Sequence, residues 1–98
     1  MSESSSDPTV RRLREEVSEV DRTIVAAVNT RLELVTRLKH HKESLGLPFL
    51  DPHREHELVE ALLAANGGPL SDDGLRELHA ELLALTKREV GRRGLDPG

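Results

Sequence analysis

The chain has 98 residues, enough for one small domain. Charged residues make up 33% of it and aromatic residues 1%, and its formal net charge is −4. It therefore lacks the base-stacking side chains and the basic surface that are typical of nucleic-acid binders. It contains no cysteine, which excludes disulfides and thiolate metal sites. No stretch reaches the ~18 apolar residues of a membrane span, and the Ser-rich, acidic start is unlike a signal peptide, so we expect a soluble cytoplasmic protein.

The first predicted element is a long amphipathic helix. Residues 1–8 are polar and end in a proline, so we expect a disordered segment there. Neither Pro nor Gly occurs from Thr9 to Leu45, and apolar residues recur at helical spacing: Leu13, Val17, Val20, Ile24, Val28, Leu34, Val35, Leu38 and Leu45. Such a helix is roughly 55 Å long, whereas a monomer of this size has a radius of gyration of only ~13 Å. We therefore expect a partner chain to cover part of the apolar stripe.

A second helix follows a clear stop. Gly46-Leu47-Pro48 ends the first helix, and Asp51 with Pro52 at the first helical position begins the next. Asn66-Gly67-Gly68-Pro69 ends it.

Ser71 is the predicted cap of a third helix, with Leu70 and Leu75 as a hydrophobic staple. Its predicted apolar stripe consists of Leu75, Leu78, Leu82, Leu85 or Thr86, and Val90. We expect residues 91–98, rich in Gly and Arg, to form a flexible tail. No segment has a strand pattern, so the sequence predicts an all-α fold with one long and two shorter helices.

Several cations lie on or beside these apolar stripes. Arg31 and Lys42 interrupt the stripe of the first helix, and they are about 20° apart around its axis. Arg14 lies about 25 Å from Arg31 along the helix, so the two cannot reach one small ligand within a chain, but Arg14 of a second chain could. Arg54 and Glu55 lie near the apolar side of the second helix. A buried cation is costly unless it is paired, and Arg suits bidentate carboxylate binding, so their combined placement indicates an anionic ligand.

A structural alternative competes with this interpretation. Any one of these cations taken alone is more simply a helix-surface residue that pairs with a neighbouring Glu or extends past an apolar stripe to water.

His53 and His56 have a spacing found in metal sites, but no third ligand is evident, so we interpret them as surface residues and predict no metal.

The order and spacing of several motifs resemble the all-helical (type II) chorismate mutases. These motifs are Leu13-Arg14-Glu15-Glu16-Val17, Asp21-Arg22, Arg31-Leu32-Glu33-Leu34, Lys42, Gly46-Leu47-Pro48, Asp51-Pro52-His53-Arg54-Glu55 and Asn66-Gly67-Gly68-Pro69-Leu70-Ser71-Asp72. The resemblance covers about residues 9–90. It implies a cofactor-free isomerase that converts chorismate to prephenate in aromatic amino acid biosynthesis. It also implies an intertwined homodimer in which each active site borrows one arginine from the partner.

The resemblance also implies roles for individual residues. Arg31 and the partner's Arg14 would bind the two substrate carboxylates, with help from Arg54. Lys42 would donate to the ether oxygen, and Asp51 and Glu55 would hold the ring hydroxyl. By this comparison Lys42, Arg31 and Glu55 are the catalytic residues.

The third helix contributes two further positions. Thr86 stands where the family often has a small hydroxyl residue near a carboxylate. Val90 stands where the family usually has Gln or Glu to bind the ether oxygen, and the neighbouring Glu89 could serve only if the helix shifted by one residue.

Other functions stay open at this point. Aminodeoxychorismate mutases and isochorismate pyruvate-lyases share the fold and the carboxylate clamp, and Val90 makes such a variant substrate more credible. A different class is a non-catalytic helical dimer that regulates or partners an enzyme of the shikimate pathway.

Overall fold

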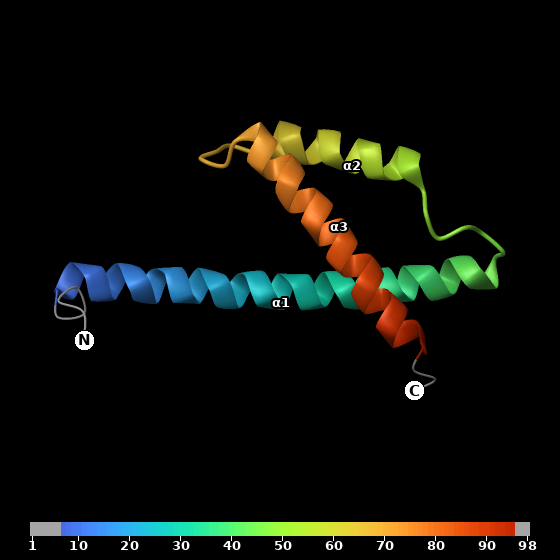
Figure 1. Ribbon diagram of the computed structural model, residues 1–98, viewed down its shortest axis with the longest axis horizontal. Helices are drawn as coiled ribbons and strands as arrows, with labels where there is room; N and C mark the ends of the chain where they lie inside the picture. Colours follow the sequence, from blue (N-terminus) through green and yellow to red (C-terminus); the bar gives the residue numbers. More distant parts are fainter. Residues whose placement is uncertain (1–6, 96–98) are drawn as a thin grey trace. The chain divides into compact units, whose positions relative to one another are not determined.

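The computed structural model describes residues 7–95, and these form three α-helices: α1 (Pro8–Ser44), α2 (Pro52–Ala65) and α3 (Asp72–Leu95) (Figure 1). No strand occurs in this part of the chain, so the predicted all-α fold is confirmed. The chain divides into two compact units, the first ending at Glu33 and the second beginning at Leu34. None of the helices within residues 7–95 is long and apolar enough to cross a membrane.

The start of α1 differs from the sequence prediction. The Oδ1 atom of Asp7 accepts hydrogen bonds from the N–H groups of Thr9 (2.8 Å) and Val10 (3.0 Å), which makes Asp7 the N-cap. Pro8 suits the first helical position because its missing N–H would have no helical partner there. Asp7 and Pro8 therefore belong to the helix start and not to a disordered segment, whereas residues 1–6 lie outside the described residues.

The end of α1 is a Schellman motif at the predicted stop. The N–H of Leu47 donates to the carbonyl of Lys42 (2.9 Å), and the N–H of Gly46 donates to the carbonyl of Glu43 (3.1 Å). Gly46 has a φ of 71°, a left-handed conformation that glycine adopts without the steric cost of a Cβ atom. This turn directs the chain from α1 into the segment before α2.

Both remaining helices begin at their predicted caps. Asp51 accepts at Oδ1 from the N–H of Arg54 (3.1 Å), and Ser71 accepts at Oγ from the N–H of Gly74 (3.0 Å). Leu70 covers the first turn of α3 so closely that a Cβ atom on Gly74 would lie 2.8 Å from Leu70 Cδ1. Local capping thus fixes where α2 and α3 start.

Within the second unit α2 and α3 pack together, and α3 carries its buried residues. The buried residues are Leu75, His79, Thr86 and Val90, which share one face of α3. Leu78, predicted on the apolar stripe, is 59% exposed instead. The buried face instead passes through His79, about 100° around the helix from Leu78.

The third helix also extends further than predicted. It continues past Val90 through Gly91 to Leu95, so residues 91–95 are helical and not part of a tail. Residues 96–98 lie outside the described residues.

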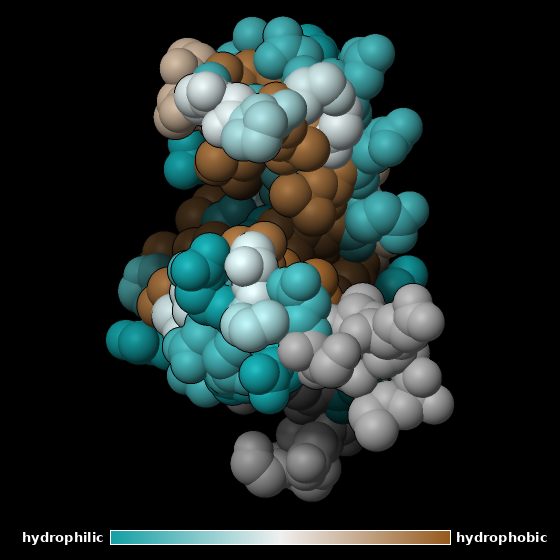
Figure 2. All heavy atoms as spheres, turned by 90° about the vertical axis from the view of Figure 1, so that its left-hand side faces the viewer, coloured by the Kyte–Doolittle hydropathy of each residue, from teal (hydrophilic) through white to brown (hydrophobic). Residues whose placement is uncertain are grey.

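The first unit is a single helix, and its apolar stripe is uncovered. No residue of α1 is buried, and Leu13, Val17, Val20 and Ile24 are each exposed by half or more. On the face drawn in Figure 2, hydrophobic residues (brown) are open at the surface, most of them in the upper half and middle of the view. The first unit holds no second element against which this helix could bury such a stripe.

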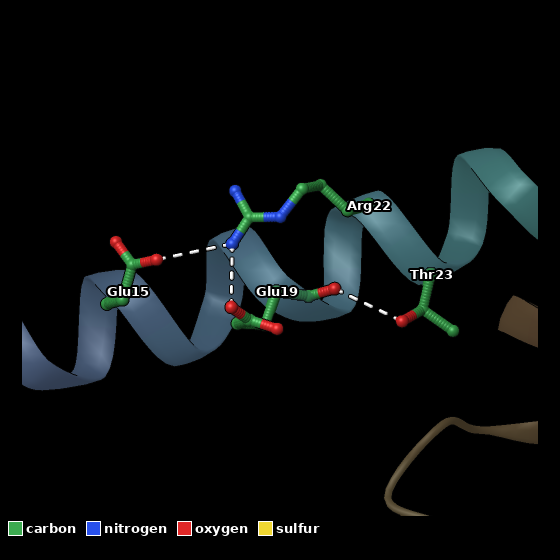
Figure 3. A network of polar contacts seen from close by, with 4 residues as sticks. All are labelled: Glu15, Glu19, Arg22 and Thr23. Atoms are coloured by element: carbon green, nitrogen blue, oxygen red, sulfur yellow. Dashed lines mark hydrogen bonds and ion pairs between the residues drawn. The ribbon is translucent and has the colours of Figure 1, made fainter.

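Charged side chains alternate with the apolar residues along the same stretch of α1. Arg22 Nη2 lies 3.2 Å from Glu15 Oε1 and 2.9 Å from Glu19 Oε1, and Thr23 Oγ1 donates to the Glu19 carbonyl (Figure 3). These side chains pair within α1 and remain well exposed, so Arg22 is a helix-surface residue of the ordinary kind.

Candidate active site

The predicted site residues are shared between the two units. Arg14 and Arg31 lie on α1 in the first unit, and Arg31 is the less exposed of the two. The other predicted residues all lie in the second unit: Lys42, Asp51, Arg54, Glu55, Thr86 and Val90.

Arg14 lines a shallow hollow on the N-terminal part of α1. The hollow has a volume of about 490 Å³, and the other residues that line it are Val10, Leu13, Val17 and Ser18. Most of these side chains are apolar, so the guanidinium of Arg14 extends from a surface that favours contact with another apolar surface.

Lys42 lies half-buried in the last turn of α1, where the following loop restrains it. Its Nζ donates to the carbonyl of Phe49 at 3.2 Å. The Schellman motif ties the backbone of Lys42 to Leu47 at the same time. Both ends of the residue are thus held, which orients the ammonium group.

The first turn of α2 brings Asp51, Arg54 and Glu55 together. The Asp51 side chain accepts from the Arg54 N–H, and the Asp51 carbonyl accepts from the Glu55 N–H at 3.0 Å. The Arg54 side chain is exposed, while Glu55 is partly buried. The cap therefore fixes the backbone from which both charged side chains extend.

Glu55 faces a residue that the sequence analysis did not single out. His79 Nε2 lies 3.6 Å from Glu55 Oε2, and the His79 side chain is 7% exposed. Both atoms are buried and have no hydrogen-bond partner. A signal is present in the sequence, because His79 is four residues after Leu75 on the same helical face.

The C-terminal half of α3 contributes Thr86 and Val90 from one buried face. Thr86 is 3% exposed and donates through Oγ1 to the Leu82 carbonyl at 2.7 Å. Val90 is 1% exposed. Glu89 forms an ion pair with Arg92 at 2.6 Å, so its carboxylate is already engaged. The unbroken helix therefore keeps Val90, and not Glu89, on the buried face with Thr86.

The histidines of α2 have the surface environment predicted for them. His53 is 85% exposed in its side chain, and its Nε2 lies 3.2 Å from Glu57 Oε1. No group of three His, Cys, Asp or Glu side chains within residues 7–95 is arranged to hold a metal ion.

The chemistry available in the second unit is binding and polarisation. Lys42 and Arg54 supply positive charge, Glu55 accepts hydrogen bonds, and Thr86 supplies a hydroxyl. Val90 supplies only an apolar surface. Such groups suit an anionic ligand whose reaction depends on orientation and charge stabilisation.

Comparison with known proteins identifies several relatives. A family model described as chorismate mutase type II matches residues 13–90. The bifunctional chorismate mutase/prephenate dehydratase of Aquifex aeolicus (strain VF5) is 29% identical over 79 residues, which cover 76% of this chain and 22% of that protein. The chain thus spans about a fifth of the length of this curated relative.

Solved structures agree with the family match. Form II of the chorismate mutase from Thermus thermophilus superimposes with a TM-score of 0.80 at 34% identity, covering 86% of this chain and 96% of that one. Form I of the same enzyme superimposes with a TM-score of 0.77 at 36% identity, covering 80% of this chain and 98% of that one.

Proposed function

The chain belongs to the chorismate mutase type II family, and on that premise we propose that it is an isomerase that converts chorismate to prephenate in aromatic amino acid biosynthesis. One observation carries the proposal. The region that matches the family contains every cation of the expected substrate clamp: Arg14, Arg31, Lys42 and Arg54.

The reaction is a concerted [3,3] rearrangement, in which one C–O bond breaks while a C–C bond forms within the same molecule. It requires no nucleophile, metal or general base. The enzyme has to hold the flexible enolpyruvyl arm over the ring, which is an orientation effect. It also has to stabilise the negative charge that grows on the ether oxygen as its bond breaks.

The two substrate carboxylates are the natural ligands of the arginines. We assign one carboxylate to Arg31 and the other to the partner's Arg14, with Arg54 as an additional cation. Planar guanidinium groups bind carboxylates with two parallel hydrogen bonds, which fixes orientation as well as position. These contacts would hold the substrate folded in its reactive conformation.

We assign charge stabilisation at the ether oxygen to Lys42. Its ammonium group is half-buried and held near the loop by Phe49, so it requires little reorganisation during the reaction. Val90 is buried and cannot donate a hydrogen bond, so Lys42 would perform this role without the second donor that the family resemblance implies. One such donor contributes about 3 kcal/mol, or roughly a hundredfold in rate.

The ring hydroxyl is assigned to the first turn of α2. Glu55 has a carboxylate with acceptor capacity remaining, and Asp51 offers backbone groups beside it. Thr86 would contribute its hydroxyl near a carboxylate, in addition to the bond that it donates to Leu82.

We also propose an intertwined homodimer. The half-exposed apolar residues of α1 and the hollow around Arg14 support it, because a second copy of α1 would cover both. In that arrangement Arg14 of each chain would complete the site of the other.

A related substrate is the second candidate, and Val90 is the observation that favours it. Without the usual second donor at the ether oxygen, the same clamp could serve isochorismate or aminodeoxychorismate.

The test is product identification with the purified chain on chorismate, isochorismate and aminodeoxychorismate. We expect prephenate from chorismate as the main product. Turnover of only one of the other two substrates would move the assignment to the second candidate. Absence of both turnover and binding with all three would contradict an enzymatic role and favour a helical module that partners another enzyme.

A further inference from the structure

The contact between α2 and α3 contains two polar atoms that face each other without any other partner. Glu55 Oε2 and His79 Nε2 are both buried, lack hydrogen bonds and lie 3.6 Å apart. Their side chains differ in environment, since that of His79 is 7% exposed and that of Glu55 is 37% exposed. His79 is thus enclosed, while part of Glu55 remains open to solvent.

Such an arrangement is costly unless the two groups act on each other. A buried carboxylate or imidazole without a hydrogen bond loses its hydration and receives nothing in return. The separation of 3.6 Å exceeds a hydrogen-bond distance, and a movement of less than about 1 Å would close it. Groups in a binding site often tighten in this way only when the ligand is present.

We propose that His79 is a positioning residue for Glu55. Its Nε2–H donates to Oε2 and fixes the carboxylate, so that Oε1 faces the ligand and accepts a hydrogen bond from the substrate hydroxyl. This inference rests on the function proposed above, in which Glu55 holds that hydroxyl.

A simple packing role for His79 is the competing explanation, and the neighbouring residues argue against it. Leu75, Thr86 and Val90 share its face, and each is apolar or satisfies its own hydroxyl within the helix. An imidazole adds a donor to this face where the Glu55 carboxylate of α2 approaches it. An apolar side chain there would leave Glu55 Oε2 without any donor.

Two variants separate positioning from packing. His79→Leu fills the buried position with an apolar side chain and removes the donor, whereas His79→Gln keeps an N–H near the position of Nε2. His53→Leu is the matched control, because His53 also lies near a glutamate but is 85% exposed. Thermal unfolding of each variant reports whether it folds.

Kinetics with chorismate provide the first measurement. Because the hydroxyl is held in both the ground and the transition state, we expect His79→Leu to raise KM about tenfold with kcat within about threefold. His79→Gln should stay within about threefold of wild type in both, and so should His53→Leu. Normal KM in His79→Leu, or equal losses in the Leu and Gln variants, would overturn the inference.

A second measurement is independent of turnover. Long-range ¹H–¹⁵N correlation spectra of the wild-type chain report which imidazole nitrogen of His79 carries a proton. We expect a protonated Nε2, and an unprotonated Nε2 at neutral pH would overturn the inference even if activity were normal. If the wild-type chain does not turn over chorismate, the proposed function fails, while the protonation of Nε2 still decides whether His79 holds Glu55.

Discussion

Lys42 and Phe49 are joined across the turn that ends α1, because the Lys42 Nζ donates to the Phe49 carbonyl at 3.2 Å. The turn depends on Gly46, whose φ of 71° reverses the chain direction between the two residues. The ammonium group that we assign to the ether oxygen is therefore held by the backbone geometry of a glycine four residues further along the chain.

Gly46→Ala tests this relationship. A Cβ atom there meets no atom within 4 Å, so the expected loss of about 1 kcal/mol comes from the left-handed backbone alone. We also expect a lower kcat because Phe49 would no longer restrain Lys42. Urea unfolding and the prephenate assay measure the two effects. Gly67→Ala is the control, since Gly67 also has open space around it and no positive φ, and a loss equal to that of Gly46→Ala would contradict the argument.

The two aspartate caps provide a matched pair. Asp7 and Asp51 each accept a backbone N–H bond at a helix start and precede a proline, so either alanine variant should lose about 1 kcal/mol of unfolding free energy. Only Asp51→Ala should also raise KM for chorismate, because only Asp51 precedes the turn that carries Arg54 and Glu55. A similar rise of KM in Asp7→Ala would remove the special role of Asp51.

Val90→Gln should raise kcat by up to about a hundredfold, because it supplies the donor that the family resemblance implies at this position. Val90 is 1% exposed, so the amide should also lower the free energy of unfolding in the absence of substrate. Val90→Met has a similar shape without the donor and should show no gain in steady-state rate. A Gln variant no faster than the Met variant would argue against an ether-oxygen site at this position.

Mixing two inactive variants tests whether Arg14 acts across the dimer. Arg14→Ala and Arg31→Ala should each lose nearly all turnover, because each leaves a substrate carboxylate unpaired. After unfolding and refolding together, the mixture should recover about a quarter of the wild-type rate, since about half of the dimers carry one intact site. No recovery despite confirmed mixed dimers would place Arg14 and Arg31 in separate functions.

The apolar stripe of α1 should determine the oligomeric state. Ile24 is 54% exposed in the single chain but would be covered in the dimer. Ile24→Glu would bury a charge at this position, so we expect dissociation or unfolding. Glu19→Ala breaks an exposed ion pair with Arg22 and should change dimer stability by less than about 1 kcal/mol. Sedimentation equilibrium distinguishes the two variants, and a fully dimeric, folded Ile24→Glu protein would exclude this interface.

The sequence by itself determined the three helices and most of their boundaries. The signals are local: Asp51 with Pro52 begins α2, Ser71 begins α3, and Gly46 ends α1 by hydrogen bonds among neighbouring residues. Asp7 with Pro8 carried the same local signal as the start of α2, and the prediction missed it. The identity of the candidate site residues also came from sequence order, because their spacing resembles that of a known family.

Only the tertiary structure decided which residues of α3 turn inward and what they meet. Residue type favoured Leu78 for the core over His79, yet Leu78 is 59% exposed and His79 is buried opposite Glu55. Burial depends on the angle at which α3 packs on α2, and no local pattern encodes that angle. The contact of Lys42 with Phe49 likewise depends on the path of the loop, so it could be seen only after the chain had folded.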